Sequence, residues 1–265
     1  YCDFNSHVRN NIDQKQWLKA YLSEIRRVSK NTSSRFLNSV FFGGGTPSLI
    51  EPSVISEILN EIQKHWKTKD NFEVTLEANP GSVDAKNFKS YRAAGINRTS
   101  MGIQSLNEKD LKALGRTHTV QEALSAFEIA QENFTAVSFD LIYARQNQKL
   151  KHWEKELTQA LGLGANHMSL YQLTIEQGTA FGDRYNRGLL KGLPNDDIAS
   201  ELYDITSNLC DDRGLKAYEV SNYAQEGFES VHNLIYWRYG DYIGIGPGAH
   251  GRLTIDGRKY ATETH

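Results

Sequence analysis

Two short stretches near the start of the chain could bind a chemical group. Cys2 carries a thiol, and Gly43, Gly44 and Gly45, followed by Thr46, end a hydrophobic run. A thiolate is a nucleophile and a metal ligand, although a lone cysteine is also commonly a small buried hydrophobe. Three successive glycines remove every Cβ from a turn, so backbone N–H groups can approach a carboxylate or a phosphate. Taken alone, the glycines favour a ligand site and a simple tight turn about equally.

Four further polar residues stand at the ends of candidate strands: Glu77, Gln104, Asp140 and Thr174. Side chains at the carboxyl ends of parallel strands meet at one edge of a sheet, where they can converge on one ligand. A carboxylate in such a place can also cap a helix or form an ion pair. Glu77 is poorly suited to capping, because residues 79–81 are themselves a turn sequence.

The elements that must position these residues alternate between strand-like and helix-like patterns. Pro52 begins one amphipathic helix, Thr119 and Glu122 form a capping box before another, and Gly214 ends a third that begins near Asp196. The predicted strands are rich in β-branched and aromatic residues. They are Ser39–Phe42, Glu73–Glu77, Thr99–Gln104, Ala136–Ile142, His167–Thr174 and Lys216–Val220.

Repeated strand–helix units predict an α/β fold with a parallel sheet and helices outside it. An open sheet would concentrate its site at one switch point, whereas a barrel gathers residues from many strand ends. Polar residues or a glycine turn end five of the predicted strands. We therefore predict a βα-barrel or part-barrel.

The composition excludes some classes of protein. The chain has 265 residues, with 30 Lys and Arg against 32 Asp and Glu, so no strong field indicates nucleic acid or a membrane surface. No apolar run is long enough to span a bilayer, and no signal peptide is visible. The two cysteines, Cys2 and Cys210, do not indicate a disulfide framework, and Cys210 is expected in the core. A cytoplasmic location is the resulting expectation.

Eight motifs occur in order along the chain and together resemble one family. They are Cys2-Asp3-Phe4, residues 43–48 (GGGTPS), 77–80 (EANP), 102–105 (GIQS), 114–118 (LGRTH), 140–143 (DLIY), 218–222 (YEVSN) and 232–237 (HNLIYW). The pattern is similar to the radical S-adenosylmethionine (SAM) family of oxygen-independent coproporphyrinogen III oxidase (HemN), and more narrowly to its haem-chaperone branch (HemW). The resemblance covers essentially the whole chain and implies a partial (β/α)6 radical-SAM, TIM-like barrel.

The resemblance implies a [4Fe–4S] cluster held by three cysteines spaced C-x3-C-x2-C, with one iron left open for SAM. Cys2 matches only the third of these cysteines. We expect the other two, and the first barrel strand, to precede Tyr1 in a longer protein. The family pattern divides the chain into a barrel domain at 1–250 and the start of a C-terminal region at 251–265.

The resemblance also implies the contacts to the methionine part of SAM. Gly44, Gly45 and Thr46 resemble the turn that receives it through backbone groups. Glu77 resembles an acceptor near the methionine ammonium or the ribose. Arg116 resembles a partner of the SAM carboxylate, where a guanidinium fork fits well.

The remaining SAM contacts implied by the family lie on later strands. Gln104 and Asp140 resemble polar contacts to the ribose hydroxyls, and Thr174 and His250 match positions of further adenosine contacts. We expect no catalytic Ser, His or Cys triad, because the cofactor supplies the chemistry in this family.

Two features favour the haem-chaperone branch. Phe4 stands where the oxidase branch has another cysteine, and His232 to Trp237 match the HNxxYW motif that the branch associates with haem. Imidazole is a common axial ligand of haem iron, and Tyr and Trp offer flat apolar surface to a macrocycle. Without the motif, a His beside aromatic residues is more often a packing residue.

The resemblance therefore implies a haem chaperone that binds haem or a porphyrin and delivers haem to respiratory haem proteins. It would have no nucleic-acid partner and would meet membranes only through a partner protein. The alternative is the oxidase itself, which decarboxylates coproporphyrinogen III to protoporphyrinogen IX in porphyrin biosynthesis, so the enzyme question stays open. A third hypothesis is a metal-free barrel aldolase or hydrolase. It would need a lysine on a strand for Schiff-base chemistry. Lys216, at the start of its strand, lies at the wrong face.

Overall fold

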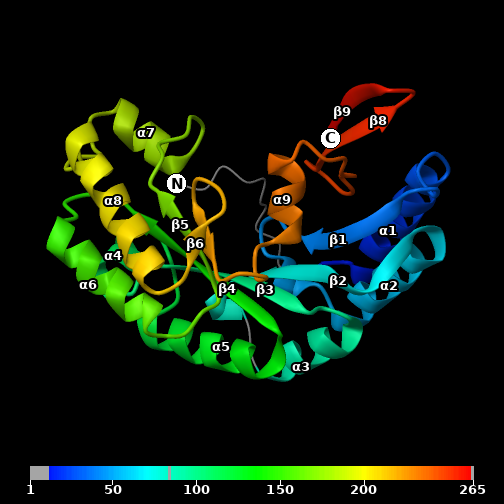
Figure 1. Cartoon of the computed structure of the whole chain (residues 1–265), viewed down its shortest axis with the longest axis horizontal. Helices are drawn as coiled ribbons and strands as arrows, with labels where there is room; N and C mark the ends of the chain where they lie inside the picture. The colour runs from blue at the N-terminus through cyan, green and yellow to red at the C-terminus, as the bar shows by residue number, and fades with distance from the viewer. Residues whose placement is uncertain (1–11, 83–84, 264–265) are drawn as a thin grey trace.

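The computed structural model describes residues 12–82 and 85–263 as a curved sheet with helices on its outer side (Figure 1). The outer helices are α1 (Gln14–Ser29), α2 (Pro52–His65), α3 (Ala85–Ala94), α4 (Glu108–Ala113), α5 (Val120–Asn133), α6 (Leu150–Leu161) and α8 (Asp196–Asp212). Two short helices, α7 (Ala180–Asn186) and α9 (Val231–Trp237), lie elsewhere, and α9 stands over the inner side of the sheet next to β1.

The main sheet has seven strands in the order β1-β2-β3-β4-β5-β7-β6. Its parallel strands are β1 (Phe36–Phe42), β2 (Lys67–Ala78), β3 (Arg98–Gln104), β4 (Ala136–Tyr143) and β5 (His167–Gln172). Two short strands, β6 (Lys216–Ala217) and β7 (Asn222–Ala224), continue the sheet in antiparallel pairing. Within the described residues the sheet stays open between β1 and β6, as expected for a partial barrel.

Most predicted elements are confirmed, and the differences concern strand ends. The capping box of Thr119 and Glu122 is present at the start of α5, and Gly214 has a φ of +75° just beyond α8. The strand predicted to reach Thr174 ends at Gln172. The prediction for 216–220 was wrong, because only Lys216 and Ala217 form a strand and they pair antiparallel with β7.

The strands alternate between an apolar outer face and a polar inner face. On β4, Val137, Phe139 and Leu141 belong to the large apolar cluster beneath the outer helices, while Ser138 and Asp140 face the lumen. Alternate residues of a strand point to opposite faces of the sheet, so this arrangement follows from the period of two. The sheet therefore packs against helices on one side and lines a polar lumen on the other.

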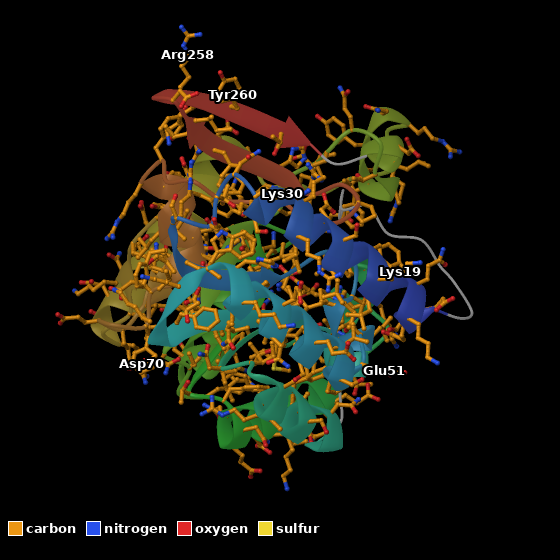
Figure 2. The ribbon with its side chains drawn as sticks, turned by 90° about the vertical axis from the view of Figure 1, so that its right-hand side faces the viewer. Lys19, Lys30, Glu51, Asp70, Arg258 and Tyr260 are labelled. Carbon is orange, nitrogen blue, oxygen red and sulfur yellow. The ribbon has the colours of Figure 1, made fainter. Side chains whose placement is uncertain are left out.

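The chain ends in a hairpin of β8 (His250–Ile255) and β9 (Arg258–Glu263), which forms a separate two-stranded sheet. Asp241 fixes it, since its carboxylate accepts hydrogen bonds from Thr254 and ion-pairs with Arg35 and Lys259. Figure 2 shows the hairpin above α1, with Arg258 and Tyr260 pointing away from the body. No helix among the described residues is both long and apolar enough to cross a membrane.

Candidate functional site

The glycine turn after β1 is tied to a lumen carboxylate. Glu77, next to last in β2, accepts a hydrogen bond from the Gly44 N–H at 3.0 Å. Gly44 has a φ of +130° and open space around the place of a Cβ atom, and Gly43 to Gly45 are exposed. The turn can therefore present backbone groups to a ligand, a use for which only glycine has the required conformation.

A second carboxylate, Asp140 on β4, lies in the same lumen. Its Oδ1 accepts a hydrogen bond from Ser100 Oγ at 3.2 Å, while the Ser169 hydroxyl on β5 donates to Asn222 Oδ1 at 2.7 Å. Burial raises the pKa of Asp140 to about 6. Burial also raises the pKa of Glu77 to about 7, and the nearby Asp140 charge contributes to that rise. Two carboxylates that lack full compensation are well suited to receive a cationic or hydroxyl-bearing ligand.

Gln104 and Arg116 complete the rim of this site. Gln104, the last residue of β3, has a φ of +74°, which is uncommon for a residue with a side chain and clusters at functional sites. Arg116 Nη2 donates to the Gly102 carbonyl at 2.8 Å. A Cβ at Gly102 would lie 2.9 Å from Gln104 Nε2 and 3.4 Å from Arg116 Nη2, so a glycine allows both side chains to converge there.

The structure does not join every predicted site residue to this cluster. Thr174 is exposed in the loop beyond β5, and His250 is exposed at the start of β8. No described contact links either residue to Glu77 or Asp140. Cys2 lies outside the described residues, and so does Phe4, on which the choice of branch partly rests. Among residues 12–82 and 85–263, no three potential ligands are grouped as a metal site.

The helix α9 places His232 against the same end of β1. The His232 ring stacks on Phe41 with a centroid distance of 4.1 Å and an angle of 14°. Tyr236 meets the His232 ring edge-on at 4.7 Å, and Tyr242 in turn meets Tyr236 at 4.5 Å. Burial lowers the pKa of His232 to about 4, so its imidazole is neutral at physiological pH. In the described part of the chain neither ring nitrogen has a hydrogen-bond partner.

Polar side chains of the lumen hold the start of α9. The Glu73 carboxylate accepts the backbone N–H of Val231 at 3.0 Å and that of His232 at 2.9 Å. The Tyr218 hydroxyl contacts His167 Nε2 at 2.7 Å and accepts a hydrogen bond from Asn233 Nδ2 at 3.2 Å. No residue of α9 is fully buried, so these bonds and the aromatic stack determine where the helix sits.

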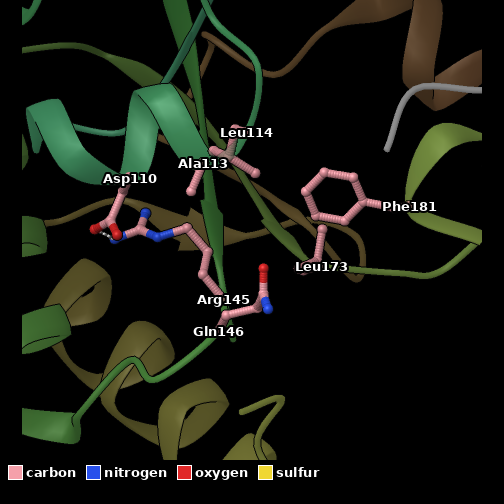
Figure 3. A pocket seen from close by; sticks show the side chains of 7 residues that line it. All are labelled: Asp110, Ala113, Leu114, Arg145, Gln146, Leu173 and Phe181. Carbon is pink, nitrogen blue, oxygen red and sulfur yellow. Dashed lines mark hydrogen bonds and ion pairs between the residues drawn. The ribbon is translucent and has the colours of Figure 1, made fainter. Parts of the chain in front are cut away.

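The structure also has two hollows away from this region. Among the described residues, those that line the hollows do not include any predicted site residue. The smaller, shown in Figure 3, has a volume of about 20 Å³, room for little more than one water molecule. Beside it Arg145 is buried and ion-paired with Asp110 at 2.9 Å and with Glu156. This cluster joins the loops after β3 and β4 and is structural.

Several residues near the site were not predicted as site residues, although Tyr218 belongs to the 218–222 motif. Phe41, Glu73, Ser100, Ser169 and Tyr218 all face the lumen or α9. A period-two pattern of polar residues runs through the strands and could have identified Ser100 and Ser169. His118, the last residue of the 114–118 motif, is buried and its ring Nε2 lies 3.1 Å from the Ile103 carbonyl oxygen, so its role is structural. Cys210 is fully buried in the core, as predicted.

The fold and the site together define a radical SAM protein. A family model described as the radical SAM superfamily matches residues 1–159. The solved structure of Escherichia coli coproporphyrinogen III oxidase (HemN), a radical SAM enzyme, superposes with a TM-score of 0.78 at 20% identity. That superposition covers 94% of this chain and 60% of the other, and it supports the fold alone.

Sequence relatives narrow the assignment. The chain is 43% identical to the "Heme chaperone HemW" of Haemophilus influenzae over 261 residues, covering 96% of this chain and 67% of that protein. It is 39% identical to the Escherichia coli protein of the same name, covering 99% and 69%. A mouse protein, "Radical S-adenosyl methionine domain-containing protein 1, mitochondrial", is 39% identical and covered over 58% of its length. The chain belongs to the radical SAM superfamily and, within it, to the haem-chaperone branch of the HemN/HemW family.

Family membership confirms the expected cofactors, SAM and a [4Fe–4S] cluster. The lumen fits SAM, since a glycine turn without Cβ atoms stands beside two partly buried carboxylates and a guanidinium. The chain spans about two thirds of the bacterial relatives and just over half of the mouse protein.

Proposed function

We propose that this protein binds haem at α9 and delivers it to haem proteins, with SAM held in the adjacent lumen. The observation that carries the proposal is the His232 imidazole, which is neutral and has no hydrogen-bond partner among the described residues. A neutral imidazole nitrogen with a free lone pair is the form that ligates haem iron. The haem-chaperone names of the bacterial relatives support the same function.

The surroundings of His232 suit a macrocycle that carries two propionates. Trp237 is 58% exposed at the end of α9 and Tyr239 just beyond it is 62% exposed, which leaves flat apolar surface at the end of the helix that carries His232. The Arg252 guanidinium lies 4.1 Å from the Tyr239 ring centroid, and Lys259 Nζ lies 4.7 Å from it. Aromatic surface and positive charge therefore meet at Tyr239, just beyond α9, as an amphipathic dianion requires.

For SAM we propose that Gly44, Gly45 and Thr46 bind the methionine end through backbone groups. Glu77 would accept from its ammonium, and Arg116 would pair with its carboxylate. We propose that Gln104 and Asp140 bind the ribose hydroxyls, and that Thr174 and His250 contact the adenosine once the site is filled. Bound to a reduced cluster, SAM supplies radical chemistry in this family, and these side chains would orient it and exclude water.

Cys2 is proposed as the third cysteine ligand of the cluster. The division into a barrel at 1–250 and a C-terminal region from 251 also remains our proposal. We place the protein in the cytoplasm, with respiratory haem proteins as acceptors and with membrane contact only through them. The near balance of charges supports the absence of a nucleic-acid partner.

The test is an anaerobic haem titration of the full-length, cluster-reconstituted protein, followed by absorbance. We expect saturation near one haem per chain and a changed ligation spectrum with weaker binding in His232→Ala. His152→Ala is the matched control, because His152 is exposed on α6, away from α9. Absence of specific haem binding, together with conversion of coproporphyrinogen III to protoporphyrinogen IX, would establish the oxidase instead.

A further inference from the structure

The two proposed ligand sites share one side chain, Phe41. Its ring stacks on His232 at 4.1 Å. It also lies against the glycine turn, since a Cβ at Gly43 would be 2.7 Å from Phe41 Cε1. That Cβ position at Gly43 is also 3.4 Å from Glu77 Oε2, the oxygen that accepts the hydrogen bond from the Gly44 N–H. One ring therefore contacts both the proposed haem ligand and the turn proposed for SAM.

An electrostatic interaction also links the two sites. Burial raises the pKa of Tyr236 to about 12, and the charges of Tyr242 and Glu77 add smaller contributions. Glu77 is thus close enough to act electrostatically on a residue that packs edge-on against His232. Phe41 therefore contacts the face of the histidine ring and Tyr236 meets it edge-on, and Phe41 also contacts the glycine turn.

We propose that SAM and haem bind cooperatively through Phe41, so that SAM in the lumen tightens the binding of haem at His232. This inference rests on the proposed function. The free turn is exposed, and among the described residues only Glu77 bonds its middle glycine. A ligand that orders the turn restricts the Phe41 ring and, through the stack, the His232 ring. The second ligand then loses less conformational entropy on binding, which is positive cooperativity.

The geometry of the stack is compatible with simultaneous binding. An imidazole ligates iron in its own plane, so a ring stacked on its face leaves the nitrogen lone pairs accessible. Because α9 has no fully buried residue, its position responds readily to its contacts. By thermodynamic linkage the effect is reciprocal, and haem must tighten SAM binding by the same factor.

The experiment is the haem titration of the full-length, cluster-reconstituted protein with and without saturating SAM, in the absence of reductant. We expect the Kd of haem to fall about fivefold or more with SAM, the lower range of measured coupling between sites. The reverse titration, SAM with and without haem, should give the same factor. In Phe41→Leu both ligands should still bind, and the two haem Kd values should become equal.

Phe42→Leu is the matched control, because Phe42 is the next residue of β1 and packs on the outer apolar clusters instead. It should keep the wild-type coupling factor. Haem binding that depends on His232 but has the same or a higher Kd with SAM would overturn the coupling and leave the haem function intact. Full coupling in Phe41→Leu would overturn the role of Phe41. Absence of specific haem binding would instead overturn the proposed function, on which the coupling depends.

Discussion

The outer and inner faces of the same strands differ in what holds their neighbours in place. On the outer face, helices such as α5 bury apolar side chains, and Phe127 meets Phe139 of β4 edge-on at 4.9 Å. On the inner face, α9 buries none of its residues fully and depends on hydrogen bonds to Glu73 and Tyr218. Apolar burial fixes the scaffold, whereas directional polar contacts position the part of the molecule that meets ligands.

This difference is expected from the energetics of the two kinds of contact. Burial of an apolar side chain is non-directional and large, about 1.5–3 kcal/mol for each fully buried residue. A hydrogen bond contributes about 1 kcal/mol net and specifies direction. An element held chiefly by the second kind can be moved by a ligand at moderate cost, which suits a binding helix.

The largest expected effect tests the outer face. Phe139 is fully buried, so Phe139→Ala should lower the free energy of unfolding by about 3–5 kcal/mol. Ser138→Ala, one residue away on the inner face, removes one hydrogen bond to Ser100 and should cost about 1 kcal/mol. Urea denaturation of both variants measures the contrast, and equal losses would contradict the division into two faces.

The next effect concerns the hydrogen bonds that position α9. Tyr218→Phe removes a hydroxyl that contacts His167, Ser230 and Asn233, and should cost about 1–3 kcal/mol locally. Amide hydrogen exchange should accelerate in α9 and change little in α5. Tyr203→Phe, on the exposed side of α8, is the control and should leave α9 protection unchanged. Unchanged exchange in Tyr218→Phe would show that the aromatic stack alone fixes the helix.

A smaller effect concerns the lumen carboxylates and pH. Glu77 and Asp140 have pKa values of about 7 and about 6, above their ordinary values, so the folded protein binds protons that the unfolded chain releases. Their contribution to stability is therefore complete below about pH 4 and is lost as the pH rises through 6 and 7.

The double variant Glu77→Gln, Asp140→Asn should remove that part of the pH dependence. Without SAM it should be about 1–2 kcal/mol more stable than wild type at pH 8 and show little difference at pH 4.5. Urea denaturation across this range measures the difference. Glu57→Gln, an exposed residue on α2, serves as the control. A constant difference at all pH values would show that the two carboxylates do not titrate as described.

The smallest effect returns to the outer face. Thr119→Ala removes the capping box of α5 and should lower the free energy of unfolding by about 1 kcal/mol. Because the buried face of α5 still holds the helix, haem and SAM affinities should stay at wild-type values. A loss of ligand affinity in this variant would show that the outer helices also position the site.

The sequence by itself determined the parallel strand–helix order, the capping box at Thr119, the helix stops and the family motifs, including Glu77, Asp140 and His232. These depend on local periodicity and on residue types at short spacing, which are visible along the chain. It also located most strands. It wrongly extended the fifth strand, β5, to Thr174 and predicted residues 216–220 to be one strand, because the ends of a strand depend on the strands it pairs with.

Only the tertiary structure decided which residues that are distant in the sequence come into contact on the inner side of the sheet. The stack of Phe41 on His232, the reach of Glu73 to α9 and the tie between Gly44 and Glu77 join segments from 33 to 191 positions apart (77 − 44 and 232 − 41). Local patterns carry no information on such contacts, because they arise only when the sheet curves and α9 closes over its inner face. For the same reason the sequence placed the SAM and haem motifs in order along the chain but gave no sign that the Phe41 ring contacts both.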